Sequence, residues 1–181
     1  SIKADLAAEK YWCNFLISFY VLNNYIQMKK YIGLLFVLVI CLQPAISQTS
    51  IELNNQGLAK FKAKNYAAAL VDFNKAVELD AKNEKALHNR ALAKYALKDY
   101  EGAIHDHTKA IELNAAYGSA YNNRGMVYYR QNNVTAALKD YNKAIDIDPA
   151  YYQAYKNRAT VQYATKNYEA ADKDYIKCIE L

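Results

Sequence analysis

Residues 118–151 decide the fold of this chain, and they read GSAYNNRGMVYYRQNNVTAALKDYNKAIDIDPAY. When the chain is aligned on itself at a spacing of 34 residues, three further stretches fall under this one without an insertion. The four units are 50–83, 84–117, 118–151 and 152–181. A fixed period of this length is typical of repeat proteins, in which each unit buries its apolar face only by stacking on its neighbours.

Small residues and large rings hold the same columns from unit to unit. The small ones are Gly57, Ala91, Gly125 and Ala159 in the first half of the unit, and Ala69, Ala103, Ala137 and Ala171 in the second half. The rings follow four residues later, at Phe73, His107, Tyr141 and Tyr175. Small side chains let two helices approach closely, and the rings fill the space between them.

Each unit is predicted to be a pair of helices. In the second unit, residues 84–97 carry Leu87, Ala91 and Tyr95 at four-residue spacing, which places them on one helix face. Residues 100–113 repeat the pattern after a short turn. With only 5 Gly and 2 Pro, the composition favours long helices over a turn-rich β fold. The expected fold class is therefore all-α.

These columns resemble the tetratricopeptide-repeat (TPR) family. The match is carried by Asn122-Asn123-Arg124-Gly125, Ala137-Leu138, Tyr141, Ala144-Ile145 and Asp148-Pro149. The resemblance covers residues 50–181, and it implies a right-handed superhelical solenoid with a concave groove lined by the first helix of each pair. It also implies a non-catalytic scaffold that binds an extended peptide segment of another protein in this groove.

The unit 152–181 is incomplete, because the chain stops inside its second helix. Repeat arrays normally need a polar capping element at the end, and none is present in this sequence. We expect either that the chain is a fragment of a longer protein or that this end packs on a partner. An uncapped end would also allow copies of the chain to associate.

The segment before the repeats is typical of a secretory signal peptide. Met28-Lys29-Lys30 precede an apolar run from Tyr31 to Leu42, and Ala45 and Ser47 are the small residues before a cut after Ser47. The run is shorter than the roughly 20 residues that a membrane-spanning helix needs. We therefore expect residues 28–47 to be a signal peptide and the repeats to be periplasmic or secreted. An uncleaved membrane anchor is the alternative.

Residues 1–27 are harder to place, since a signal peptide rarely follows so long an extension. We interpret Met28 as the native start. On that interpretation residues 1–27 are a wrongly included or disordered extension, and a mature product would begin at Gln48.

An asparagine recurs in the first helix of every unit and forms what we call the Asn ladder. Its members are Asn55, Asn89, Asn123 and Asn157. An Asn side chain offers an acceptor and two donors, so it can pair with both groups of a peptide backbone. The ladder resembles those by which some repeat proteins hold extended peptides, which makes it the candidate peptide-binding site. The alternative is that these side chains bond to neighbouring helices and stabilise the stack.

An aromatic column follows the Asn ladder by six residues. Its members are Phe61, Tyr95, Tyr129 and Tyr163. Aromatic residues at helical spacing usually pack between helices. A tyrosine can also be a groove contact, because its ring buries area while its hydroxyl seeks a partner. Both interpretations are open for this column.

The groove lacks the family's clamp for the C-terminal carboxylates of chaperones. That clamp uses Lys and Asn in the first unit, Asn in the second, and Lys and Arg in the third. The corresponding residues here are Asn54 and Leu58, Asn89, then Ser119 and Asn123. Without its cations a carboxylate clamp loses its charge-assisted bonds, so a chaperone terminus is not the expected ligand.

Two charged columns are predicted to be structural pairs between neighbouring units. They are Asp72, Asp106 and Asp140, and Arg90, Arg124 and Arg158, each Arg standing 18 residues after an Asp. Unit one has no preceding Asp and carries Gln56 in the Arg column. We therefore expect each Arg to pair with the Asp of the preceding unit. Pairing within one unit is the alternative.

The remaining features favour neither an enzyme nor a cofactor. His107 stands in a column of rings, and His105 lies elsewhere on the helix, so the two are not expected to share a metal. The three cysteines, Cys13, Cys41 and Cys178, have no metal-ligand or disulfide pattern. The net charge of +5 is small and evenly spread, which argues against nucleic-acid binding.

Two other functions fit the same residues. The repeats could form the sensory or regulatory part of a longer signalling or enzymatic chain. They could also belong to a membrane-anchored assembly factor, which requires that residues 31–46 stay uncleaved. The identity of the protein or peptide partner is not encoded in any motif of the sequence.

Overall fold

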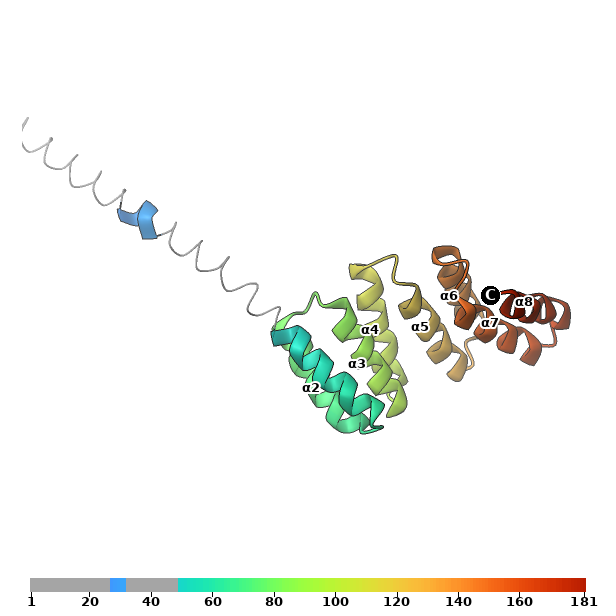
Figure 1. Ribbon diagram of the computed structural model, residues 1–181, viewed down its shortest axis with the longest axis horizontal. Helices are drawn as coiled ribbons and strands as arrows, with labels where there is room; N and C mark the ends of the chain where they lie inside the picture. The colour runs from blue at the N-terminus through green and yellow to red at the C-terminus, as the bar shows by residue number, and fades with distance from the viewer. Residues whose placement is uncertain (1–26, 32–48) are drawn as a thin grey trace, which may run out of the picture. The chain divides into compact units, whose positions relative to one another are not determined.

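The computed structural model describes residues 27–31 and 49–181 of the chain (Figure 1). In these ranges the backbone forms helices joined by short turns, and no strand occurs. Residues 27–31 are a short helical stretch that belongs to a different compact unit from the repeats. The proposed cut site, most of the apolar run and residues 1–26 lie outside the described residues, so the signal peptide stays a prediction. Within those described residues, no helix has the length and apolarity to span a membrane.

The repeats form four helix pairs, as the period predicts. The first helix covers residues 49–62 of the described chain, and the others are α2 (Tyr66–Leu79), α3 (Glu84–Ala96), α4 (Tyr100–Leu113), α5 (Gly118–Arg130), α6 (Val134–Ile147), α7 (Tyr152–Ala164) and α8 (Tyr168–Glu180). Figure 1 shows the pairs following one another in a row. The all-α prediction is confirmed.

Side-chain caps set the start of several helices. Asn65, Asn83, Asp99 and Asn133 each accept a hydrogen bond from a backbone N–H in the first turn that follows. Such a cap satisfies one of the N–H groups that have no partner within the helix. The turn inside each pair has one residue with positive φ, at Lys64, Lys98, Asn132 and Lys166. One turn geometry therefore recurs in all four units.

The first helices of the pairs lie on the inner side of the curve. Helix α3 contacts α5 and α5 contacts α7, whereas among α2–α8 the second helices α2, α4, α6 and α8 do not contact one another. In a curved stack the elements on the concave side lie closest together. We therefore call residues 49–62, α3, α5 and α7 the inner helices, and α2, α4, α6 and α8 the outer helices.

The core lies at the junctions between units as much as within them. Ile111 on α4 packs against Leu87 and against Ala120 of the next unit, and Ile145 on α6 packs against Ala154 in the same way. Fully burying one such side chain contributes about 1.5–3 kcal/mol. A single unit leaves this surface exposed, so each unit depends on its neighbours for stability.

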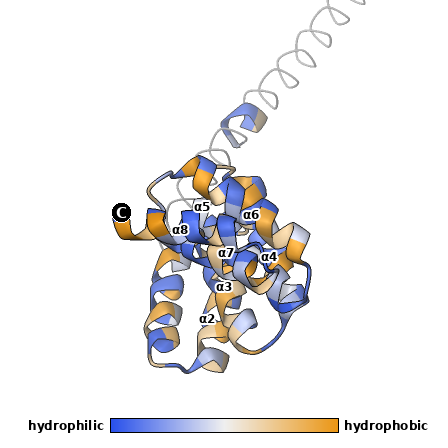
Figure 2. Cartoon of the chain, turned by 90° about the vertical axis from the view of Figure 1, so that its right-hand side faces the viewer, coloured by the Kyte–Doolittle hydropathy of each residue, from blue (hydrophilic) through white to orange (hydrophobic). Residues whose placement is uncertain are grey.

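The two ends of the stack differ in polarity. The first inner helix carries exposed Glu52 in the column where later units have fully buried Ala86, Ala120 and Ala154. At the other end, Ile179 on α8 is 85% exposed, although Ile145 in the same column is 9% exposed. Figure 2 views the array from the α8 side, where apolar residues lie near the C-terminus. The described face of α8 thus exposes apolar residues that the internal junctions bury.

Candidate binding groove

The Asn ladder lies on the inner helices, where a concave binding site requires it. Asn89, Asn123 and Asn157 are half-buried on α3, α5 and α7, and Asn55 is exposed on the first inner helix. Successive members therefore come from successive inner helices. The structure places them in one row along the concave side.

Each half-buried ladder residue donates its amide to the preceding inner helix. Asn89 Nδ2 donates to Asn54 Oδ1 at 2.8 Å, and Asn157 Nδ2 donates to Asn122 Oδ1 at 2.9 Å. Asn123 Nδ2 approaches His88 Nε2 at 3.5 Å. These contacts are the ones that the stacking interpretation predicts. The ladder holds neighbouring inner helices together.

The side-chain oxygens of the ladder make fewer hydrogen bonds than its amide nitrogens. Asn123 Oδ1 accepts from Asn122 Nδ2 at 3.2 Å. Within residues 49–181, the Oδ1 atoms of Asn89 and Asn157 accept no hydrogen bond, and the side chain of Asn55 makes no hydrogen bond. Two of the three half-buried members therefore keep a free acceptor for a ligand N–H group.

The aromatic column packs mainly between helices. Phe61 lies against the cluster of Ala69 and Phe73, and Tyr129 lies against the cluster of Tyr141 and Val161. Rings of the following outer helix stand close by. The ring pairs are Phe61–Tyr66 at 5.1 Å, Tyr95–Tyr100 at 5.7 Å and Tyr163–Tyr168 at 5.2 Å between centroids. The packing interpretation thus accounts for the side of these rings that faces the neighbouring helices.

Two members of the column also present polar or exposed surface. The Tyr95 hydroxyl accepts a hydrogen bond from Arg130 Nε at 3.0 Å. Tyr163, in the last described unit, is 60% exposed. These two tyrosines are the members best placed to contact a partner.

The arginines pair within their own unit, so our expectation of pairs with the preceding unit is wrong. Arg90 donates two bonds of 2.7 Å to the carboxylate of Asp106, 16 residues later. Arg124 binds Asp140 and Arg158 binds Asp174 in the same bidentate geometry. In unit one, which has Gln56 in the Arg column, Lys60 Nζ lies 2.6 Å from Asp72 instead. Lys94, in the same column as Lys60, binds Asp106 beside Arg90. In unit one the lysine thus holds the Asp without an arginine, with no need for an earlier Asp.

The arginines still connect neighbouring units, through residues that the sequence reasoning missed. Arg124 Nη1 donates to Thr108 Oγ1 at 3.0 Å, and Arg158 Nη1 donates to Asn142 Oδ1 at 2.6 Å. Arg90 Nη1 reaches Asn74 Oδ1 at 3.4 Å. The signal in the sequence was a polar column of Asn74, Thr108 and Asn142 that ends at Ile176.

His88 and His107 form a buried pair in the middle of the array. Both rings are buried, and their centroids lie 5.0 Å apart. Burial lowers the pKa of His88 to about 4 and lowers the pKa of His107 as well, so both rings are neutral at pH 7. No group of three metal-ligating side chains occurs in the described part of the chain. His107 serves as the packed ring of its column.

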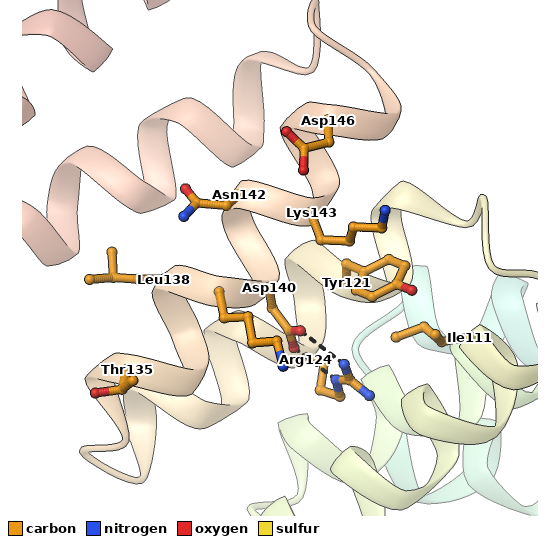
Figure 3. A pocket seen from close by; sticks show the side chains of 10 residues that line it. Ile111, Tyr121, Arg124, Thr135, Leu138, Asp140, Asn142, Lys143 and Asp146 are labelled. Atoms are coloured by element: carbon orange, nitrogen blue, oxygen red, sulfur yellow. Dashed lines mark hydrogen bonds and ion pairs between the residues drawn. The ribbon is translucent and has the colours of Figure 1, made fainter.

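A surface hollow of about 810 Å³ lies away from the Asn ladder, beside α6. Figure 3 shows the Arg124–Asp140 pair in its wall, together with Lys143 and Asp146 from the outer helix. This hollow is the gap that neighbouring outer helices leave on the convex side.

Family models match the repeats unit by unit. One tetratricopeptide-repeat model matches residues 118–151, and a second matches residues 53–83, 84–117 and 152–181. Among curated protein sequences, none matches the chain.

Several solved structures share the fold. A crystal structure of MamA is 25% identical, with 73% of this chain and 77% of that one covered and a TM-score of 0.67. The first TPR of Spaghetti (RPAP3), bound to the HSP90 peptide SRMEEVD, is 28% identical over 66% of this chain and 95% of that one, with a TM-score of 0.64. The second TPR domain of human RPAP3, in complex with the HSP70 peptide SGPTIEEVD, is 25% identical over 65% and 98%, with a TM-score of 0.62. The predicted solenoid of helix pairs is the fold of these structures.

Proposed function

Because the chain belongs to the tetratricopeptide-repeat family, we propose that it is a non-catalytic scaffold that holds an extended segment of another protein in its concave groove. The observation that carries the proposal is the row of free acceptors on the inner helices. Asn89 Oδ1 and Asn157 Oδ1 stand on α3 and α7 without a donor among residues 49–181. An extended backbone offers N–H groups at regular intervals, which is what such a row can bind.

The similar structures support a peptide as the class of ligand. The two RPAP3 domains are described with peptides of HSP90 and HSP70. In this chain Leu58, Ser119 and Asn123 replace residues of the chaperone clamp, including its cations. The proposed partner is therefore a different segment, held by its backbone along the groove.

The cellular location is proposed from the sequence of residues 28–47 alone. A basic start, a short apolar run and small residues before Gln48 favour export of the repeats to the periplasm or the cell exterior. N-terminal sequencing of the native protein tests this part. A product that begins at Gln48 would support it, and recovery of Ser1 would contradict it.

The binding role of the ladder is tested by separating it from the stacking role. Asn89→Ala removes both the bond to Asn54 and the free oxygen, whereas Asn54→Ala removes the same bond and leaves Asn89 in place. Asn157→Ala and Asn122→Ala form a second pair, in which Asn122→Ala also removes the bond to Asn123 Oδ1. The four variants are compared with wild type in a pull-down from the extracytoplasmic fraction, with far-UV circular dichroism to check folding.

We expect Asn89→Ala and Asn157→Ala to lose a partner that Asn54→Ala and Asn122→Ala retain. Equal capture by all five proteins would show that the ladder is only structural. Equal loss in both members of a pair would assign the effect to helix stacking.

A further inference from the structure

The charges on the inner face identify the chemistry of the partner, if the groove binds a peptide as proposed above. On a helix, positions three, four and seven residues before or after a given residue lie on the same side. Applied within the inner helices to Leu58, Leu92, Met126 and Thr160, each three residues after a ladder residue, this rule defines what we call the ladder face. Its charged members are Lys62, Lys85, Arg130 and Lys156, one from each unit. Every Asp and Glu of residues 49–181 lies outside it.

These four cations are exposed and are not neutralised by a carboxylate. No ion pair forms at any of them within residues 49–181, and Arg130 bonds only to the neutral hydroxyl of Tyr95. Lys60, Lys94 and the three paired arginines instead bind buried aspartates. Cations without an ion pair also stand on other faces, such as Lys143 on α6, but on the ladder face no carboxylate accompanies them.

Acidic neighbours weaken the attraction of the ladder face for anions at Lys85. Asp80 and Glu84 border the hollow of about 370 Å³ that Lys85 also lines. Near Arg130, the carboxylate of Glu101 already accepts a bond of 2.6 Å from Gln131 Nε2. The net attraction for an anion is therefore strongest toward Lys62, Arg130 and Lys156.

The distribution of the cations fits carboxylates spaced along a chain, and does not fit one terminal carboxylate. A terminal clamp needs several donors that converge, but each of these cations stands on a different inner helix. Packed helices lie about 8–10 Å apart, and an extended chain advances about 3.3–3.6 Å per residue. One unit therefore spans about three residues of an extended ligand.

The free acceptors favour a polypeptide over a nucleic acid. Asn89 Oδ1 and Asn157 Oδ1 can accept from backbone N–H groups, whereas a phosphodiester backbone offers only acceptors. Half-buried Leu58, Leu92 and Met126 on the ladder face add apolar surface between the charges. We propose that the groove selects an extended polypeptide segment with an acidic residue at about every third position, bound through its interior.

The probe for this proposal is a fluorescent 12-residue peptide with Asp at every third position and neutral residues between, acetylated and amidated at its ends. Its matched control has Asn in place of each Asp. Fluorescence anisotropy with the full chain measures both dissociation constants. We expect the Asp peptide to bind at least about tenfold more tightly at low salt, with the difference shrinking as salt rises.

Charge reversals locate the contact. We expect Arg130→Glu and Lys156→Glu each to weaken the Asp peptide about three- to tenfold, because each replaces one attraction by a repulsion. Lys143→Glu on the convex side is the matched control, and it should change the affinity less than twofold. Equal weakening by Lys143→Glu would reduce the effect to net charge and overturn the proposal.

Further ligands separate the competing explanations. The peptide SRMEEVD with a free terminus and with an amidated terminus tests the terminal clamp, and tighter binding of the free form than of the Asp peptide would overturn our inference. A 12-nucleotide single-stranded DNA that binds more tightly than the Asp peptide would overturn it too. If the Asn peptide binds as tightly as the Asp peptide and is lost in Asn89→Ala, charge selection fails but the groove stands. If no peptide depends on Asn89 or Asn157, the proposed function fails as well.

Discussion

Gly125 on α5 faces the ring of Tyr141 on α6 so closely that a Cβ at position 125 would lie 2.9 Å from Tyr141 Cε1. The same Cβ would lie 3.1 Å from the carbonyl oxygen of Ala137, which belongs to the backbone and cannot turn aside. Where the second unit has Ala91 in this column, the facing ring is the smaller His107. In the first three units, the size of one residue is thus matched to the size of the other. Unit four combines Ala159 with Tyr175, and that ring is 37% exposed where the other three are buried.

This match predicts that Gly125→Ala destabilises the array by about 1–3 kcal/mol, because the core has no room for the added methyl group. Replacing Tyr141 by His as well recreates the Ala91–His107 combination. We expect the double variant to be more stable than the sum of the two single effects predicts, by about 1 kcal/mol or more. Urea unfolding followed by circular dichroism measures all four proteins. Strict additivity would show that the two positions are independent.

The sequence was sufficient for the repeats because the period of 34 residues carries the unit boundaries and the small-residue columns together. It was not sufficient for the partners of the arginines. Arg90 stands 18 residues after Asp72 and 16 before Asp106, and both separations connect one helix to another. Unit one has Gln56 where the other units have an arginine, and this difference suggested pairing with the preceding unit. The inference was wrong because Lys60, one helical turn after Gln56, binds Asp72. Side-chain reach, which the helix packing sets, decided the pairing.

The Asn ladder shows the same limit for the candidate site. Its spacing indicates one polar residue per inner helix, but a ligand and a neighbouring helix compete for the same amide. The 2.8 Å bond from Asn89 to Asn54 depends on how closely the inner helices approach. That distance follows from the small residues at each junction and is not visible as a motif. Period and composition therefore predicted which residues share the inner helices but did not show which of their atoms remain free.

The arginine network predicts two separable losses at the junction of units two and three. Arg124→Ala leaves the carboxylate of Asp140 buried without its partner, which should cost about 3–5 kcal/mol. Thr108→Ala removes only the bond between units, and the expected cost is about 0.5–1.5 kcal/mol. Arg124→Gln copies the residue of unit one and should fall between them.

Thermal and urea unfolding measure the three variants of this network. A cost for Thr108→Ala equal to that of Arg124→Ala would place the main contribution between units instead of within them. An unchanged unfolding midpoint for Arg124→Ala would show that the network does not contribute to stability.

The buried His88 predicts a stability that falls in mild acid. Its pKa is about 4 in the folded protein, and the ordinary value is 6.5. Between these values the unfolded chain binds more protons, so stability rises with pH from about 4 to about 6.5. The contribution is complete above that range and amounts to about 3 kcal/mol. His107, Tyr117 and Asn123 face the ring and supply no carboxylate to hold a charge.

Unfolding measured at a series of pH values tests this dependence with two variants. His88→Asn inserts the residue that units one and three carry in the same column, and it should make the profile between pH 4 and 6.5 less steep, while the buried His107 keeps part of the dependence. His105→Asn is the control, because His105 is exposed on α4 and should leave the profile unchanged. If the stability of His88→Asn rises with pH as steeply as that of wild type, the acid sensitivity belongs to His107 or to another group.

The uncovered face of α8 predicts association through like ends. Ile176 and Ile179 are 56% and 85% exposed there, and burial of apolar surface favours pairing of two such faces. Head-to-tail stacking is disfavoured, because Glu52 would be buried where the internal junctions have alanine. We therefore expect a concentration-dependent dimer that does not grow further. Ile176→Asn, which restores the residue of Asn74 and Asn142, and Ile179→Lys should both shift it toward monomer.

The charge at Glu52 then acts as the barrier to filament growth. Glu52→Ala places at the first inner helix the alanine of Ala86, Ala120 and Ala154, so both ends of the stack become apolar. Because a head-to-tail contact does not close on itself, this variant should form species larger than a dimer. Sedimentation velocity of wild type, Ile179→Lys and Glu52→Ala over a range of concentrations distinguishes these states. A wild type that stays monomeric at the highest concentration, or an Ile179→Lys variant that still dimerises, would show that α8 is not the contact.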